Sequence, residues 1–166
     1  MPFSLLPKVQ TPKLTDITPD HLRSWGVKLL MLDFDNTIVP YTTTVPTDEM
    51  EAWLREMNNL PDIRLCIVSN SRNDRVPKFC SERNMEVITH AKKPFTKGIN
   101  ECLRKFGMDP RDAALVGDQI FTDTLGANCA GVKSVLVKAI DNHNFWLKAR
   151  HVLELPFIFF ARNRRM

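Results

Sequence analysis

Short apolar runs alternate with longer amphipathic stretches along most of this chain, and this alternation constrains its fold more than any other feature. The runs are rich in Val, Ile and Leu without polar alternation, which is typical of strands buried on both faces. They span residues 27–32, 63–68, 85–89, 113–116 and 132–137. Helix-like spacing is found in the stretches between them, residues 47–58, 73–83, 96–106 and 121–130. The pattern predicts an α/β fold: a doubly wound, Rossmann-like parallel sheet of five strands with helices on both faces.

The length of 166 residues is that of one ordinary domain. We therefore expect residues 1–166 to form a single domain, with the Pro-punctuated leader, residues 1–27, packed on the core. Within the leader, Thr18 followed by a proline predicts a short helix that ends at Gly26. Residues 143–166 are expected to form a C-terminal helix and a basic tail that contains an aromatic cluster.

The charge of the chain is unevenly distributed. Residues 133–166 hold seven Lys and Arg against two acids, whereas residues 1–132 hold 16 basic and 17 acidic side chains. We therefore expect no nucleic-acid partner, because the basic charge is confined to one end. The cysteines lack metal-binding spacing and are interpreted as reduced thiols, and no apolar stretch is long enough to span a membrane. The expected location is the cytoplasm, with peripheral contact to a membrane as an extension of it.

Polar and charged side chains follow the first four apolar runs. Asp33, Asp35 and Thr37 follow the first run, Ser69 and Asn70 the second, Lys93 the third, and Asp118 the fourth, with Asp123 five residues further on. Ligands of such sheets bind outside the carboxyl ends of the strands, so we expect these residues to converge on one edge. Acids are costly to place beside an apolar sheet unless a cation or a reaction uses them.

The spacing of the first two acids indicates the chemistry. Asp33 and Asp35 are two residues apart in extended chain, so both carboxylates point the same way while Phe34 turns toward packing. Two such charges cannot both stay ionised without a cation, so one binds a proton or a metal neutralises them. Either outcome suits phosphoryl transfer. Asp33 could attack phosphorus, and Asp35, kept protonated, could donate a proton to the leaving oxygen.

The remaining candidates fit the same reaction. Asp118 would complete an all-oxygen site of the kind that Mg²⁺ prefers. Ser69 could donate a hydrogen bond to a phosphate oxygen, and Lys93 could balance the negative charge. Thr37 and Asn70 are further phosphate-binding candidates. Taken singly, these residues predict only a helix cap, turns and a solvated lysine. Their order on successive strands is what favours an active site.

These segments resemble the motifs of the haloacid dehalogenase (HAD) superfamily of phosphohydrolases. Asp33-Phe34-Asp35-Asn36-Thr37 fits the first motif, D-x-D-x-[TV], Ser69 the second, Lys93 the third, and Gly117-Asp118 with Asp123 the fourth. The resemblance implies that Asp33 is a nucleophile forming an aspartyl-phosphate and that Asp35 is the general acid and then the base. It implies Mg²⁺ held by Asp33, Asp118 and the backbone carbonyl of Asp35. For Asp123 it implies a supporting role near the metal or Lys93.

Within the superfamily, the chain resembles the YqeG-like branch of subfamily IIIA, which also contains phosphatidylglycerophosphate phosphatases. It is carried by residues 32–39 and 117–123 and by the leader segments 5–7 and 16–19. HAD enzymes usually carry a cap domain, but only residues 38–46 separate the first motif from the next helix. A helix and a strand fill the interval between the second and third motifs, so the site is expected to be capless. An open site suits a large or lipid-borne phosphate such as phosphatidylglycerophosphate.

Other interpretations stay open. One is a soluble phosphatase of small phosphate esters or nucleotides whose site is closed by a partner, and another is a catalytically silent phosphate-binding module. A phospho-accepting receiver is excluded, because its acceptor Asp follows the third strand, where this chain has Thr89-His90-Ala91. The aromatic residues and arginines at 157–165 predict either an interfacial membrane anchor or a segment packed on the protein body.

Overall fold

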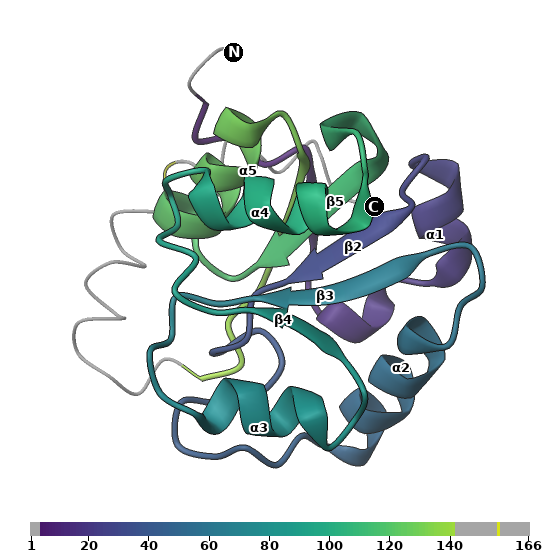
Figure 1. Cartoon of the computed structure of the whole chain (residues 1–166), viewed down its shortest axis with the longest axis vertical. Helices are drawn as coiled ribbons and strands as arrows, with labels where there is room; N and C mark the ends of the chain where they lie inside the picture. The colour runs from purple at the N-terminus through teal and green to yellow at the C-terminus, as the bar shows by residue number, and fades with distance from the viewer. Residues whose placement is uncertain (1–3, 142–155, 157–166) are drawn as a thin grey trace.

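The computed structural model describes residues 4–141 and Pro156, and in this part of the chain six parallel strands form one sheet (Figure 1). The strands are β1 (Val9–Thr11), β2 (Leu29–Leu32), β3 (Arg64–Val68), β4 (Glu86–Ile88), β5 (Ala113–Gly117) and β6 (Lys133–Val137), in the order β1-β6-β5-β2-β3-β4. The α-helices are α1 (Pro19–Ser24), α2 (Asp48–Asn58), α3 (Arg75–Ser81), α4 (Lys97–Phe106) and α5 (Leu125–Ala130). The predicted doubly wound α/β fold is confirmed.

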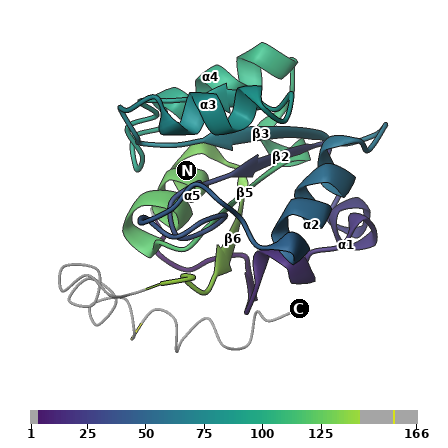
Figure 2. The same ribbon diagram turned by 90° about the horizontal axis from the view of Figure 1, so that it is seen from below.

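Helices cover both faces of the sheet. Figure 1 shows α4 and α5 on one face and α1, α2 and α3 on the other, and Figure 2 shows β3, β2, β5 and β6 in succession across the molecule. In β2, Leu30 and Leu32 pack in the core beneath α1–α3, whereas Leu29 and Met31 pack beneath α4 and α5. All four side chains are fully buried. This two-sided burial explains why the strands carry no alternating polar residues.

The sheet has one strand more than the five predicted. Strand β1 lies in the leader and pairs with β6 in parallel, with Val9 opposite Val135 and Thr11 opposite Val137. Only three residues long and flanked closely by prolines, it carries too little hydrophobic pattern to be recognised in the sequence. The predicted leader helix is present as α1, capped by the Thr18 hydroxyl.

Polar contacts attach the leader to the rest of the molecule. Asn128 of α5 donates hydrogen bonds from Nδ2 to the carbonyls of Ser4 and Leu6, at 2.7 and 3.0 Å. Its Oδ1 accepts from the hydroxyl of Ser134, at 2.8 Å. Trp53 of α2 donates from its indole to the carbonyl of Ile17, at 2.7 Å. The leader is thus held from both faces of the sheet.

The helical stretch predicted at residues 121–130 also differs in detail. It begins as a π-helical turn at Ile120–Thr124 and continues as α5. Within residues 4–141, no helix combines the length and hydrophobicity that crossing a membrane requires. The predictions for the C-terminal helix and the basic aromatic tail lie outside the described residues.

Asn128→Ala is expected to lower the free energy of unfolding by about 2–3 kcal/mol. The substitution removes three hydrogen bonds, and it leaves the fully buried Ser134 hydroxyl without its acceptor. Urea denaturation measures the loss. The matched control is Asn59→Ala, whose exposed amide bonds only the Arg55 carbonyl and whose replacement should cost under about 1 kcal/mol. Equal losses in the two variants would contradict a role for Asn128 in anchoring the leader.

Candidate active site

The first acidic motif leaves the carboxyl end of β2. The Asp33 N–H donates to the Val116 carbonyl at 2.8 Å and thereby extends the pairing of β2 with β5 by one residue. Phe34 is fully buried and packs edge-on against Phe79 of α3, with ring centroids 5.0 Å apart. Asp33 and Asp35, on either side of it, both line a cavity of about 330 Å³, as the two-residue spacing predicts.

A buried lysine, Lys93, lines this cavity. The Lys93 ammonium is 2.7 Å from Oδ1 of Asp33 and 2.7 Å from Oδ1 of Asp123, and its side chain is 1% exposed. Burial acts to lower the pKa of Lys93, but the carboxylates of Asp123 and Asp33 outweigh it and hold that pKa above its ordinary value. The raised pKa favours the charged form of Lys93 beside the Asp33 carboxylate.

The Asn70 side chain fixes the main chain of this lysine. Its Oδ1 accepts from the Lys93 N–H at 2.8 Å, and its Nδ2 donates to the Lys93 carbonyl at 2.9 Å. Asn70 and Ser69 line the cavity, and the Ser69 hydroxyl also accepts from the Ser71 N–H at 3.0 Å. Sequence reasoning considered Asn70 only as a phosphate contact and missed its position against Lys93.

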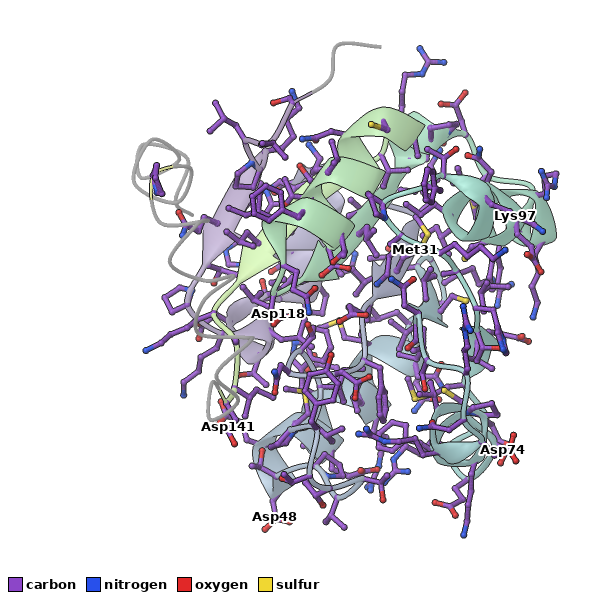
Figure 3. All side chains as sticks on the ribbon, turned by 90° about the vertical axis from the view of Figure 1, so that its left-hand side faces the viewer. Met31, Asp48, Asp74, Lys97, Asp118 and Asp141 are labelled. Atoms are coloured by element: carbon purple, nitrogen blue, oxygen red, sulfur yellow. The ribbon has the colours of Figure 1, made fainter. Side chains whose placement is uncertain are left out.

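The fourth motif brings two more acids to the same edge of the sheet. Asp118 follows β5 and is labelled in Figure 3, between α5 above it and Asp48 of α2 below it. Thr37 donates from its hydroxyl to Oδ1 of Asp118 at 3.5 Å. Asp123 folds back so closely that a Cβ at Gly117 would lie 2.2 Å from its Oδ2. Gly117 is therefore required for Asp123 to reach Lys93.

Three of these acids form one cluster. Carboxylate oxygens of Asp33, Asp118 and Asp123 all lie within 4.8 Å of one another. Burial raises the pKa of Asp118, and the nearby charge of Asp33 adds to that effect. Burial also raises the pKa of Asp123, to about 6, although Lys93 opposes it. The cluster sets three carboxyl groups against one ammonium, and its candidate ligand atoms are all oxygens. Such a site fits a divalent cation such as Mg²⁺.

Arg75 is a site residue that sequence reasoning missed. Its guanidinium lies 2.9 Å from Oδ1 of Asp35 and 5.2 Å from the centre of the Phe34 ring. It also donates to the carbonyls of three residues in the loop after the first motif, Pro40, Tyr41 and Thr43, at 3.4, 3.3 and 3.0 Å. Burial raises the pKa of Asp35, while Arg75 acts to lower it. The only signal in the sequence was a cation at the start of the helix after the second motif.

Residues 1–140 match the protein family described as mitochondrial PGP phosphatase, where PGP is phosphatidylglycerophosphate. The chain belongs to this family. This PGP phosphatase family member is similar to the probable phosphatase YqeG of Bacillus subtilis (strain 168), with 33% identity over 132 residues that cover 80% of this chain and 76% of the relative.

A second relative is the mitochondrial phosphatidylglycerophosphatase GEP4 of Saccharomyces cerevisiae, which is 29% identical over 147 residues, 80% of this chain and 77% of GEP4. The fold resembles the magnesium-bound putative HAD-hydrolase YfnB of Bacillus subtilis, with a TM-score of 0.52 and 12% identity over 66% of this chain and 86% of that one. The chain is thus a phosphatase with the HAD fold, as its motifs predicted.

Arg75→Ala is expected to lower kcat for p-nitrophenyl phosphate by roughly 10- to 100-fold, because it removes the cation that orients Asp35. It should also speed proteolysis within residues 40–46, whose carbonyls lose their donor. Arg75→Lys should recover only part of kcat, since an ammonium cannot span the same set of acceptors. The control is Arg23→Ala, which breaks an exposed pair with Asp62. A wild-type kcat in Arg75→Ala would show that Asp35 needs no such orientation.

Proposed function

We propose that this family member is a Mg²⁺-dependent phosphomonoester hydrolase that acts through an aspartyl-phosphate at Asp33. The observation that carries the proposal is the Lys93 ammonium, buried 2.7 Å from Asp33 beside a cluster of further acids. A carboxylate held in one orientation next to a fixed positive charge is suited to attack on an anionic phosphate group. The predicted nucleophile and its predicted cation are thus in contact.

The roles of the two acids in the first motif follow from their surroundings. Asp33 attacks phosphorus, and the bond from phosphorus to the ester oxygen breaks. Asp35, whose pKa is raised by burial, donates its proton to that leaving oxygen. Asp35 then takes a proton from the water that hydrolyses the aspartyl-phosphate. Ser69, which lines the cavity, supplies a hydroxyl donor to the phosphate group, whereas the Thr37 hydroxyl donates to Asp118.

The proposed metal site uses oxygen donors from two strand ends. Asp33, Asp118 and the backbone carbonyl of Asp35 would hold Mg²⁺, which when bound draws charge from the phosphate oxygens. Asp123 is assigned a supporting role, because its Oδ1 contacts Lys93 and its Oδ2 accepts from the Gln119 N–H at 3.1 Å.

Asp33→Asn is expected to lower kcat by several orders of magnitude with an unchanged circular dichroism spectrum, because the amide keeps the shape of the carboxylate but not its nucleophilicity. The control is Asp48→Asn, an exposed acid in the first turn of α2. EDTA should silence the wild-type enzyme, and added Mg²⁺ should restore it. Activity of Asp33→Asn within tenfold of wild type would rule out covalent catalysis, and full activity after chelation would rule out the metal.

For the substrate we propose a lipid-borne phosphomonoester, phosphatidylglycerophosphate. The family description and the name of the yeast relative support this substrate. A further observation is that the large exposed apolar side chains among the described residues all follow the carboxyl ends of strands: Tyr41 and Val45 after β2, Phe95 after β4 and Ile140 after β6. These four side chains, here called the apolar rim, lie on segments that follow strand ends at the edge of the sheet that holds the polar site, which suits a phosphate presented at a lipid surface.

The rim offers a membrane contact besides the one predicted for the C-terminal tail, which lies outside the described residues. The cytoplasmic location stays a prediction, since the name of the yeast relative assigns only that protein to mitochondria.

The double variant Val45→Ser/Phe95→Ser is expected to weaken sedimentation with anionic vesicles roughly tenfold, because it removes two of the most exposed apolar side chains of the rim. Hydrolysis of phosphatidylglycerophosphate in those vesicles should fall in parallel. Hydrolysis of soluble glycerol 3-phosphate by the same variant is the control and should stay at the wild-type rate. Unchanged vesicle binding would contradict lipid contact through the rim and favour a soluble substrate with the site closed by a partner.

A further inference from the structure

A second cavity, of about 460 Å³, adjoins the catalytic cavity. Arg72, His90 and Lys92 line it together with Asn70, which lines both cavities. Lys92 directly precedes the catalytic-site lysine, Lys93. The Asn70 side chain would therefore lie between a ligand group in the second cavity and a phosphate at Asp33.

The two cavities differ in how their positive charges are compensated. In the catalytic cavity Lys93 faces Asp33 and Asp123, and Arg75 faces Asp35. No acidic residue lines the second cavity, and within residues 4–141 neither Arg72 nor Lys92 forms an ion pair. An anion bound there would meet positive charge that no carboxylate already neutralises.

The loop that carries His90 and Lys92 is held against the end of β3. His90 and Lys92 have φ values of 52° and 57°, a left-handed conformation that is costly for residues other than glycine. The His90 N–H donates to the Ser71 carbonyl at 3.3 Å, and the Ala91 N–H donates to the Ser69 carbonyl at 3.0 Å. These contacts fix the backbone that carries the His90 and Lys92 side chains.

We propose that the cavity lined by Arg72, His90 and Lys92 is a second anion subsite, which binds the phosphodiester of a substrate whose terminal phosphomonoester lies at Asp33. The inference rests on the proposed function. Phosphatidylglycerophosphate carries both groups, with one glycerol between them: the diester joins that glycerol to the lipid, and the monoester is at its far end. The subsite would distinguish this substrate from simple phosphomonoesters.

The test uses Arg72→Gln/Lys92→Gln and two soluble substrates. Deacylated phosphatidylglycerophosphate carries the diester and the monoester, whereas glycerol 3-phosphate carries the monoester alone. The wild-type enzyme should prefer the first. In the variant, kcat/KM for the deacylated substrate should fall roughly 10- to 30-fold, mainly through KM, and that for glycerol 3-phosphate less than threefold, because only the first has a diester to lose contact with.

Two further variants serve as controls. Lys8→Gln/Arg64→Gln makes the same change of charge at exposed residues by the amino ends of β1 and β3, at the opposite edge of the sheet, and should keep the wild-type preference. Arg72→Lys/Lys92→Arg keeps both charges and should retain most of it. Equal losses on both substrates, or a loss confined to phosphatidylglycerophosphate in vesicles, would overturn the subsite; the latter result would assign the cations to a membrane surface.

A binding measurement separates this inference from the proposed function. This measurement is calorimetric titration in the Asp33→Asn background. There, the Gln substitutions should weaken the binding of deacylated phosphatidylglycerophosphate by the same roughly 10- to 30-fold factor and the binding of glycerol 3-phosphate less than threefold. Unchanged affinity for the deacylated compound would overturn the subsite even if the wild-type enzyme hydrolyses the lipid. The other informative outcome is that binding of the deacylated compound is selectively weakened, while the enzyme hydrolyses neither the lipid nor the deacylated compound. That outcome would refute the proposed substrate and leave the subsite standing.

Discussion

The rest of the site depends on the Lys93 ammonium buried between Asp33 and Asp123. Removing one member of a buried ion pair leaves an uncompensated charge, which typically costs about 3–5 kcal/mol. The end of β2, the loop after β4 and the turn after β5 must therefore assemble together. Gly117 and Asn70 serve this assembly, the first by making room for Asp123 and the second by holding the Lys93 main chain.

Two acids only two residues apart can take different roles because their surroundings differ. Asp33 faces Lys93, whereas Asp35 faces Arg75 and lies beneath a loop that the same guanidinium holds. Burial and the charge of Asp33 raise the pKa of Asp35, which suits a proton donor. Separate environments that push neighbouring carboxyl groups toward different protonation states are a general means of dividing acid and nucleophile.

The sequence predicts those parts of the fold and site that depend on local pattern. Five strands were recognisable because each is a run of apolar residues buried on both faces, and the acids could be assigned to one edge because they follow those runs. Strand β1 was missed because its three residues hold a place only against β6. Arg75 was missed because its partners, Asp35 and the carbonyls of the loop after the first motif, lie more than 30 residues away in the sequence, and no spacing predicts that contact. A local sequence pattern does not indicate contacts between segments that are distant in the sequence.

Strand β1 also decides what lies at one border of the sheet. Without it, β6 would be the outermost strand and would present unpaired N–H and C=O groups beside the apolar residues Val135, Leu136 and Val137. Such an edge is a template for strand pairing between molecules, and short edge strands are a common protection against it. With the leader anchored by Asn128, the sheet formed by the described residues has the three-residue strands β1 and β4 at its two borders. Pairing with β1 thus occupies the hydrogen-bonding groups of β6 that could otherwise pair with a strand of another molecule.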